Sequence, residues 1–301
     1  MLERLIKGLV GGLRSGLCIG VGERSIAVVR ASRWRGGRGE VLGVYVFSDT
    51  GAVTPAQIAT QLGILLHASG CTRRVVRFVV ADAWMRSWMV TPPHNAVRFA
   101  DCQAAAALRF QLLYNETPGA WRLTADWDAR QPFLACALPV VLLDALVQVA
   151  RDCQLVVLGM TPHFIAAWNR WHHSLDPNAW LGVVHDGVLT VGIVLAQRLR
   201  AVRATTLPGA GWQDGHWLPQ HLAREALRLN VPMPSAIQLC GQVPSAAVEN
   251  RGSWTISSGA DDGVFDSAGR LLRCSRLGLA VAAGEIAGSG SVDLAYAQAQ
   301  Q

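Results

Sequence analysis

The stretch that decides the fold is Leu17-Cys18-Ile19-Gly20-Val21-Gly22-Glu23-Arg24-Ser25-Ile26-Ala27-Val28-Val29-Arg30. It reads as an apolar strand, a tight turn that contains Gly22, and a second strand. Because glycine lets backbone N–H groups come close to an anion, such a hairpin can hold a phosphate group. A nucleotide site would also need a carboxylate that positions a hydrated cation, and none lies between Ile19 and Val21. The segment therefore predicts the frame of a nucleotide site without its cation chemistry.

The two halves of the chain begin with the same pattern. Three strands with tight turns are predicted near the start, and three more follow in the second half. Each set is an antiparallel meander, and each is followed by alternating helices and strands, which indicates an internal duplication. The sequence thus predicts an α/β fold of two lobes, each a mixed sheet that opens with a three-strand meander. The predicted strands are 17–21, 25–32 and 40–48, then 180–184, 189–195 and 199–206.

Further elements follow from periodicity and from helix start signals. Thr54 and Pro55 are typical of an N-cap and a first helical turn, so a helix is expected from there to about Ala68. Four more helices are predicted at 97–114, 139–153, 162–173 and 218–229, and a final one at 271–283. The other predicted strands are 75–81, 84–91, the hairpin 121–127 and 133–138, 155–160, 237–240 and 254–257.

Domain boundaries are predicted where the composition of the chain changes. The polar turn at 175–178 is predicted to separate the lobes. We expect an amphipathic N-terminal segment at 1–15, a first lobe at 16–176 with an inserted subdomain around 93–138, a second lobe at 177–284, and a flexible Gly/Ser-rich tail at 285–301.

Composition limits the function classes. Charged residues make up 16% of the 301 residues, against about 25% in typical soluble domains, which indicates extensive burial or a surface that needs a partner. The net charge is +6, and arginines cluster at 33–38 and 73–77. These clusters are typical of solvated loops and strand edges, and a nucleic-acid interface would need both of them on one exposed face. No nucleic-acid partner is expected.

Seven scattered cysteines with no C-x-x-C pattern indicate a reducing compartment with buried free thiols. The eight histidines show no zinc-site spacing, so no metal is expected. The longest apolar stretch, 133–150, contains Pro139 and Asp144 and is not a membrane span. The segment 1–14 has one apolar helical face, which is consistent either with peripheral membrane contact or with packing on its own domain.

Several short strings follow one another in the order seen in a known family. Ile19 to Ala27 lies in register with that family's first phosphate loop, although Gly20 stands at its Asp position and Ala27 at its Lys position. The second phosphate hairpin matches Val184-His185-Asp186-Gly187, and the adenosine-side glycine pair is reduced to Leu239-Cys240-Gly241-Gln242. Further matches are 79–93, the helix 97–114 with Asn115-Glu116-Thr117-Pro118 and Asp126, and Leu277-Gly278-Leu279-Ala280. From residue 17 to 284 the chain resembles a divergent member of the PilM family.

This resemblance implies an actin/sugar-kinase ATPase fold and a role as a cytoplasmic scaffold. Such a scaffold lies at the inner face of the inner membrane, in a type IV pilus or type II secretion assembly. The implied partner is a PilN-like single-pass membrane protein, bound through its N-terminal peptide, with assembly motor ATPases as further partners. We expect the first lobe to hold this peptide in a groove beside its sheet. The alternative is an actin-like ATPase that still binds ATP.

The candidate cofactor site is a vestigial nucleotide cleft, for which ATP is the one ligand to consider and no cofactor is required. Asp186 offers a substitute for the missing carboxylate, displaced by one residue. Such a displacement along a strand turns the side chain to the wrong face unless the turn compensates. The residues predicted to form the cleft are Gly20, Gly22, Ser25, Gly187 and Gly241.

The candidate partner-binding residues are Trp84, Met85, Trp88 and Met89, with the two tryptophans on one face of a predicted strand. Soft apolar surface of this kind suits a docked peptide, and large aromatics equally fill cores. The same two interpretations, a docking surface or a packed core, apply to the helix residues Trp168, Trp171 and His172.

No catalytic residue is predicted, because no G-x-S-x-G elbow occurs. Asp126 and Asp128 are expected on one strand face, where paired carboxylates serve either acid–base chemistry or simple solvation.

Overall fold

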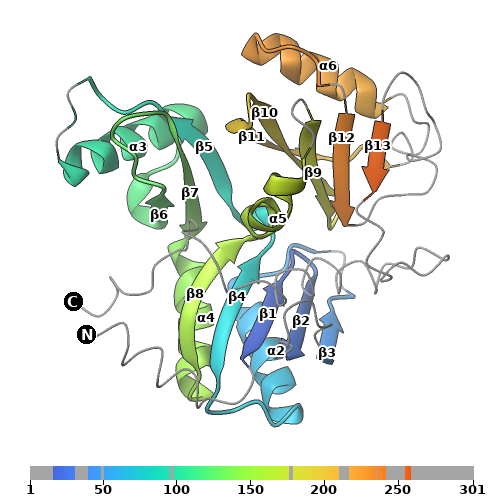
Figure 1. The fold of residues 1–301 in the computed structure, drawn as a ribbon. Helices are drawn as coiled ribbons and strands as arrows, with labels where there is room; N and C mark the ends of the chain where they lie inside the picture. Colours follow the sequence, from blue (N-terminus) through green and yellow to red (C-terminus); the bar gives the residue numbers. More distant parts are fainter. Residues whose placement is uncertain are drawn as a thin grey trace.

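The computed structural model describes residues 16–30, 40–48, 51–94, 96, 98–175, 179–209, 217–234, 236–241 and 255–258. Three sheets organise them (Figure 1). The first sheet has the order β3-β2-β1-β4-β8, in which β1 pairs antiparallel with β2 and parallel with β4. Its strands are β1 (Leu17–Val21), β2 (Ser25–Arg30), β3 (Glu40–Val46), β4 (Val75–Val80) and β8 (Val156–Pro162).

The second sheet repeats this plan with the order β11-β10-β9-β12-β13. Again the first three strands in sequence form an antiparallel meander, and the last two join it in parallel. The predicted duplication and the two-lobed α/β fold are thereby confirmed. The strands are β9 (Ala179–His185), β10 (Val188–Leu195), β11 (Arg198–Thr206), β12 (Ala236–Gly241) and β13 (Thr255–Ser258).

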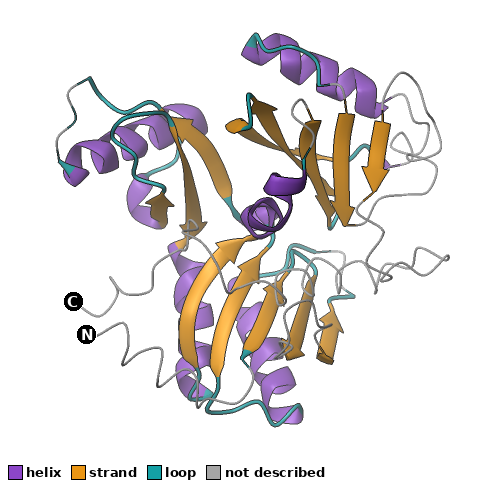
Figure 2. Ribbon diagram, in the orientation of Figure 1, coloured by secondary structure: helices purple, strands orange, loops and turns teal. Residues whose placement is uncertain are grey.

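Two helices cover one face of the first sheet, as Figure 2 shows. They are α2 (Pro55–Ala68) and α4 (Val140–Asp152). The start of α2 follows from its sequence, because the Thr54 hydroxyl accepts from the Gln57 N–H while the Gln57 side chain accepts from the Thr54 N–H. Along α2 every fourth residue is buried, which gives the helix one apolar face; these residues are Ile58, Leu62 and Leu66.

A third, smaller sheet with the order β5-β7-β6 interrupts the first lobe. It begins at Arg86, earlier than the predicted start of the inserted subdomain at residue 93. Helix α3 packs on it around a separate apolar core in which the ring centroids of Trp88 and Phe110 lie 5.2 Å apart. The elements are β5 (Arg86–Val90), α3 (Phe99–Tyr114), η2 (Pro118–Ala120), β6 (Trp121–Ala125) and β7 (Phe133–Pro139).

Helix α5 (His163–Trp171) continues from β8 and lies between the three sheets (Figure 1). The short η3 (His172–Ser174) follows it and leads toward the second lobe. Gly192 on β10 permits a close approach to this helix, because a Cβ atom there would lie 2.4 Å from the ring of Phe164. Helix α6 (Trp217–Leu229) packs on the second sheet. Helix α5 therefore joins the lobes by packing as well as by chain connection.

Several predictions lie outside the described residues. These are the segment 1–15, the arginine cluster at 33–38, residues 176–178 of the lobe boundary, the helix at 271–283, Cys274, the Leu277-Gly278-Leu279-Ala280 string and the tail at 285–301. Of the cysteines that the structure does describe, all six are free thiols, and five of them are buried. Among the described helices, none has the length and apolarity that a bilayer crossing requires.

Candidate functional site

The turns of two hairpins, one from each lobe, meet where the lobes pack on each other. The β1–β2 turn contributes the backbone of Glu23 and Arg24, and the β9–β10 turn contributes the side chain of Asp186. The Glu23 N–H donates to Asp186 Oδ2 over 2.9 Å, and the Arg24 N–H donates to the same oxygen over 3.4 Å. Two consecutive N–H groups that point at one oxygen form an anion-binding nest. The nest that was predicted to face a phosphate thus holds a carboxylate of the protein itself.

Hydrogen bonds and close neighbours hold Gly22 in the β1–β2 turn. Its N–H donates to the Ser25 carbonyl over 2.7 Å, and its own carbonyl accepts from Trp84 Nε1 over 3.0 Å. A Cβ atom at Gly22 would lie 2.5 Å from Asp186 Oδ2 and 2.6 Å from Ser25 Oγ. Only glycine therefore allows the carboxylate of Asp186 to reach the turn.

The β9–β10 turn resolves the question that the sequence left open about Asp186. This residue has φ of 48°, in the left-handed region, and it lies outside the extended part of both strands. The turn compensates for the one-residue displacement and directs the carboxylate toward the β1–β2 turn of the other lobe.

The remaining residues of the predicted cleft lie nearby in the same two sheets. Gly20 is buried in β1 and pairs with Ala27. Gly187 has φ of 74° and completes the β9–β10 turn. Gly241 ends β12 with φ of 94° and pairs with Val184. The fold therefore brings Gly22, Ser25 and Gly187 to the meeting point of the hairpins, while Gly20 and Gly241 support the strands that carry them.

A layer of buried titratable groups lies behind the hairpins. The carboxylate of Asp82 accepts from the Phe164 N–H, with both oxygens 3.1 Å away, and from the hydroxyl of Thr190. Burial nevertheless raises the pKa of Asp82 from 3.8 to about 7. Burial lowers the pKa of His163 from 6.5 to about 3, and the His163 and His185 rings lie 5.0 Å apart. Burial also lowers the pKa of His185, against the effect of Asp186.

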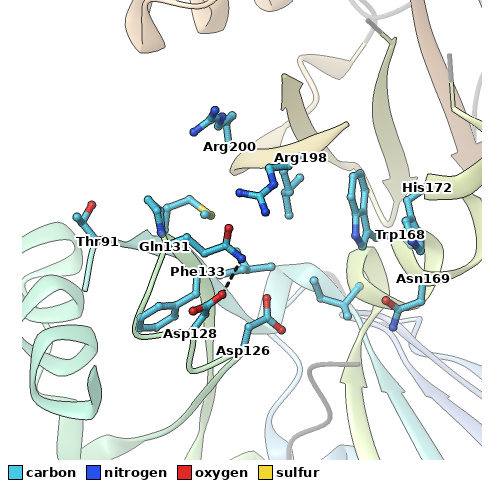
Figure 3. A pocket seen from close by; sticks show the side chains of 15 residues that line it. Thr91, Asp126, Asp128, Gln131, Phe133, Trp168, Asn169, His172, Arg198 and Arg200 are labelled. Carbon is cyan, nitrogen blue, oxygen red and sulfur yellow. Dashed lines mark hydrogen bonds between the residues drawn. The ribbon is translucent and has the colours of Figure 1, made fainter. Parts of the chain in front are cut away.

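A polar cavity of about 720 Å³ lies between the small sheet, helix α5 and β11 (Figure 3). Arg198 and Arg200 line it from β11, and Asp126 and Asp128 line it from the β6–β7 turn. Trp168 of α5 forms one side. Carboxylates and guanidinium groups therefore face one cavity from different elements, which is an arrangement for binding a ligand that carries both charges.

The two aspartates do not lie on a strand, because β6 ends at Ala125, so the prediction that they share a strand face is wrong. Burial raises the pKa of Asp126, although the hydrogen bond that its carboxylate accepts from the Leu134 N–H acts in the opposite direction. Hydrogen bonds from the Arg130 N–H and the Gln131 side chain lower the pKa of Asp128. The two neighbouring carboxyls thus differ in how readily they ionise.

The four predicted partner-binding residues have separate environments. Trp84 belongs to the 3₁₀ turn η1 (Asp82–Trp84) and not to a strand, so it cannot share a strand face with Trp88, and that part of the prediction is wrong. Trp88 packs in the core beneath α3, and Met85 is buried in the main core. Met89 is half-buried and lines the cavity. Docking of a partner on these residues stays a prediction, and Met89 is the member that a ligand can reach.

Sequence reasoning missed Arg198 and Arg200 as candidate binding residues. Both are exposed and flank the half-buried Leu199 on β11. The alternation of basic and apolar residues in this strand was the available signal. It did not show that β11 would lie opposite the acidic β6–β7 turn, because that depends on how the lobes pack.

Comparison with known proteins gives a fold and no sequence family. No family model matches the chain, and no curated protein matches it either. Among solved structures, it is similar to a chain of the PilM-PilN type IV pilus biogenesis complex, with a TM-score of 0.61 and 14% identity over 90% of this chain and 99% of that one. The fold is actin-like.

Two further structures agree. The cytoplasmic domain of EpsL, an inner membrane component of the type II secretion system of Vibrio cholerae, gives a TM-score of 0.53 at 12% identity, covering 88% of this chain and 94% of that one. A Bacteroides thetaiotaomicron protein with an actin-like ATPase fold and unknown function gives 0.55 at 9% identity, covering 78% and 85%. The expected resemblance to PilM-type and type II secretion proteins is thereby confirmed at the level of the fold.

Proposed function

We propose that this chain is a cytoplasmic scaffold of a type IV pilus or type II secretion assembly, located at the inner face of the inner membrane. In this role it binds the N-terminal cytoplasmic peptide of a PilN-like membrane protein. The observation that carries the proposal is the fold shared with a chain of a PilM-PilN type IV pilus biogenesis complex over 90% of this chain. The role requires a peptide-binding surface and no turnover of nucleotide.

The cavity beside the small sheet is the peptide site that the geometry favours. Among the described strands, β5 pairs with β7 and β11 pairs with β10, so each is the last strand of its sheet. Both end strands contribute to the cavity, through Met89 and Leu199. An extended peptide gains main-chain hydrogen bonds at such an edge and places alternate side chains into pockets. Most of the lining belongs to the predicted first lobe, as expected for the groove.

The charges of the lining set the chemistry of the peptide. Arg198 and Arg200 suit an acidic side chain, and Asp126 and Asp128 suit a basic one. Apolar contact comes from Met89 and Trp168, whose soft or aromatic side chains are common at peptide interfaces. We therefore expect a peptide of mixed charge with at least one large apolar anchor.

The contact between the two hairpin turns is evidence against ATP hydrolysis. A triphosphate would need the N–H groups of Glu23 and Arg24, and Asp186 occupies both. This contact supports a scaffold over the alternative of an ATPase.

Fluorescence anisotropy with the labelled N-terminal peptide of the cognate PilN-like protein tests the proposal. The wild-type chain should bind, and Arg200→Glu should weaken binding about tenfold, which corresponds to ~1.4 kcal/mol. Arg122→Glu makes the same charge change at an exposed position on β6 outside the cavity, and it should leave affinity unchanged. Absence of binding by the folded wild-type chain, or equal effects of the two variants, would count against this function and this site.

A further inference from the structure

We propose that the β1–β2 turn is an oxyanion-binding site that the protein fills with its own carboxylate, Asp186. In this assignment Asp186 is an internal ligand that ties the second lobe to the first. A free oxyanion of the phosphate or carboxylate class binds there once that side chain is removed. The inference concerns the cleft between the hairpins and is independent of peptide binding in the cavity.

The contacts are those of a bound anion. One oxygen of Asp186 receives two consecutive N–H groups, from Glu23 over 2.9 Å and from Arg24 over 3.4 Å. The two partners are more than 160 residues away along the sequence, so the contact is made entirely by the packing of one lobe on the other. Hydrogen bonds from neutral N–H groups to a carboxylate are shorter and stronger than those between neutral groups.

The turn is also shaped for this ligand. The missing side chain at Gly22 leaves the space that Asp186 Oδ2 enters, since a Cβ atom there would lie within 2.5 Å of that oxygen. The turn is held rigidly by the hydrogen bonds of the Gly22 N–H and carbonyl to Ser25 and Trp84. A rigid nest loses little entropy when it binds an anion.

Titratable side chains lie close to Asp186. His185 precedes Asp186 at the end of β9, and its Nδ1 lies 3.4 Å from Asp186 Oδ2. From the packed elements, the ring of His163 on α5 lies 5.0 Å from that of His185. Burial lowers the pKa of both histidines.

An internal ligand outcompetes a free one by its effective concentration. A group held in place by the fold acts at millimolar concentration or above, without dissociating from the protein. Free phosphate therefore does not enter the wild-type site at ordinary concentrations, and the lobes stay tied without any cofactor. The lobes of this chain need no nucleotide to keep their arrangement.

Chemical rescue tests the inference. Asp186→Gly removes the carboxylate, and glycine accepts the φ of 48° without strain. We expect this variant to melt several degrees below wild type and to regain most of that loss in sodium phosphate or sodium formate, compared with sodium chloride at equal ionic strength. Wild type should show no such anion-specific shift.

A matched control separates backbone effects from loss of the ligand. Gln197→Gly changes another exposed turn residue with a left-handed φ of 60°, and it should show no anion-specific shift. If Asp186→Gly fails to fold in chloride but folds in phosphate, the inference is supported. If it folds equally well in all three salts, or if Asp186→Asn and Asp186→Gly melt with wild type, the inference is wrong. Peptide affinity is measured separately, so failure here leaves the proposed scaffold function standing.

Discussion

Replacement of Asp82 by asparagine should make the protein more stable above neutral pH. Asp82 is buried where η1 meets the first turn of α5, and burial raises its pKa from 3.8 to about 7. A carboxyl whose pKa is raised on folding favours the native state while protonated. That stability is complete below the unfolded pKa and is lost as the pH rises through the folded pKa.

The size of the effect follows from the shift. About 3 pKa units at about 1.4 kcal/mol per unit give a total on the order of 4 kcal/mol, lost between about pH 4 and pH 7. Asparagine has nearly the shape of the neutral acid, retains an acceptor for the Phe164 N–H, and does not titrate. The stability of Asp82→Asn relative to wild type should therefore grow by about 3 kcal/mol between about pH 5 and pH 8.

Thermal melting of both proteins across this range measures the difference. At this chain length about 3 kcal/mol corresponds to roughly 5–10 °C. His163 stays neutral in the fold because burial lowers its pKa to about 3, so it lowers stability as the pH falls below 6.5, but it does so in both proteins and cancels in the comparison. A difference that stays constant with pH, or that shrinks on the alkaline side, would refute this account of Asp82.

Three further predictions concern stability. Gly241→Ala should lower the free energy of unfolding in urea by more than about 3 kcal/mol, because φ is 94° there and a Cβ atom would lie within 2.1 Å of the Val184 carbonyl oxygen. At Gly63 on α2 an added Cβ atom would meet nothing within 4 Å, so Gly63→Ala should instead raise the free energy of unfolding by about 1 kcal/mol. Trp88→Ala should cost about 3–5 kcal/mol and loosen α3, seen as faster amide exchange there, and an exchange pattern unchanged in α3 would contradict a separate small core. Thr54→Ala should lower the stability by about 1 kcal/mol through loss of the N-cap, with no change outside experimental error as the contrary result.

Local signals predicted most of the fold. The capping residues at Thr54, the apolar periodicity of the helices, and the tight turns of the two meanders act over a few residues, so they can be read from the sequence. The strand predicted at 84–91 is present as β5, but its start at Trp84 was wrong, because a 3₁₀ turn there brings the indole N–H to the Gly22 carbonyl, a partner 62 residues away. Sequence alternation alone does not reveal such a distant hydrogen bond.

The candidate sites were predictable only in part. Gly22 was predicted to lie in a nucleotide cleft, which stays a prediction; the carboxylate that the structure places at this turn comes from the other lobe, so it depends on how the two lobes pack. The same holds for the cavity, where Arg198 and Asp126 come from different lobes and meet only in the folded protein. Charges that are far apart in sequence give no local pattern.

We propose that this actin-like chain acts as a scaffold without nucleotide, because the Asp186 carboxylate occupies the N–H groups of the β1–β2 turn. Melting of the wild-type protein with and without millimolar MgATP tests this most directly. We expect MgATP to cause no measurable change in the melting temperature of the wild-type protein. A shift of several degrees that depends on both magnesium and ATP would show that the cleft binds nucleotide, and would contradict it.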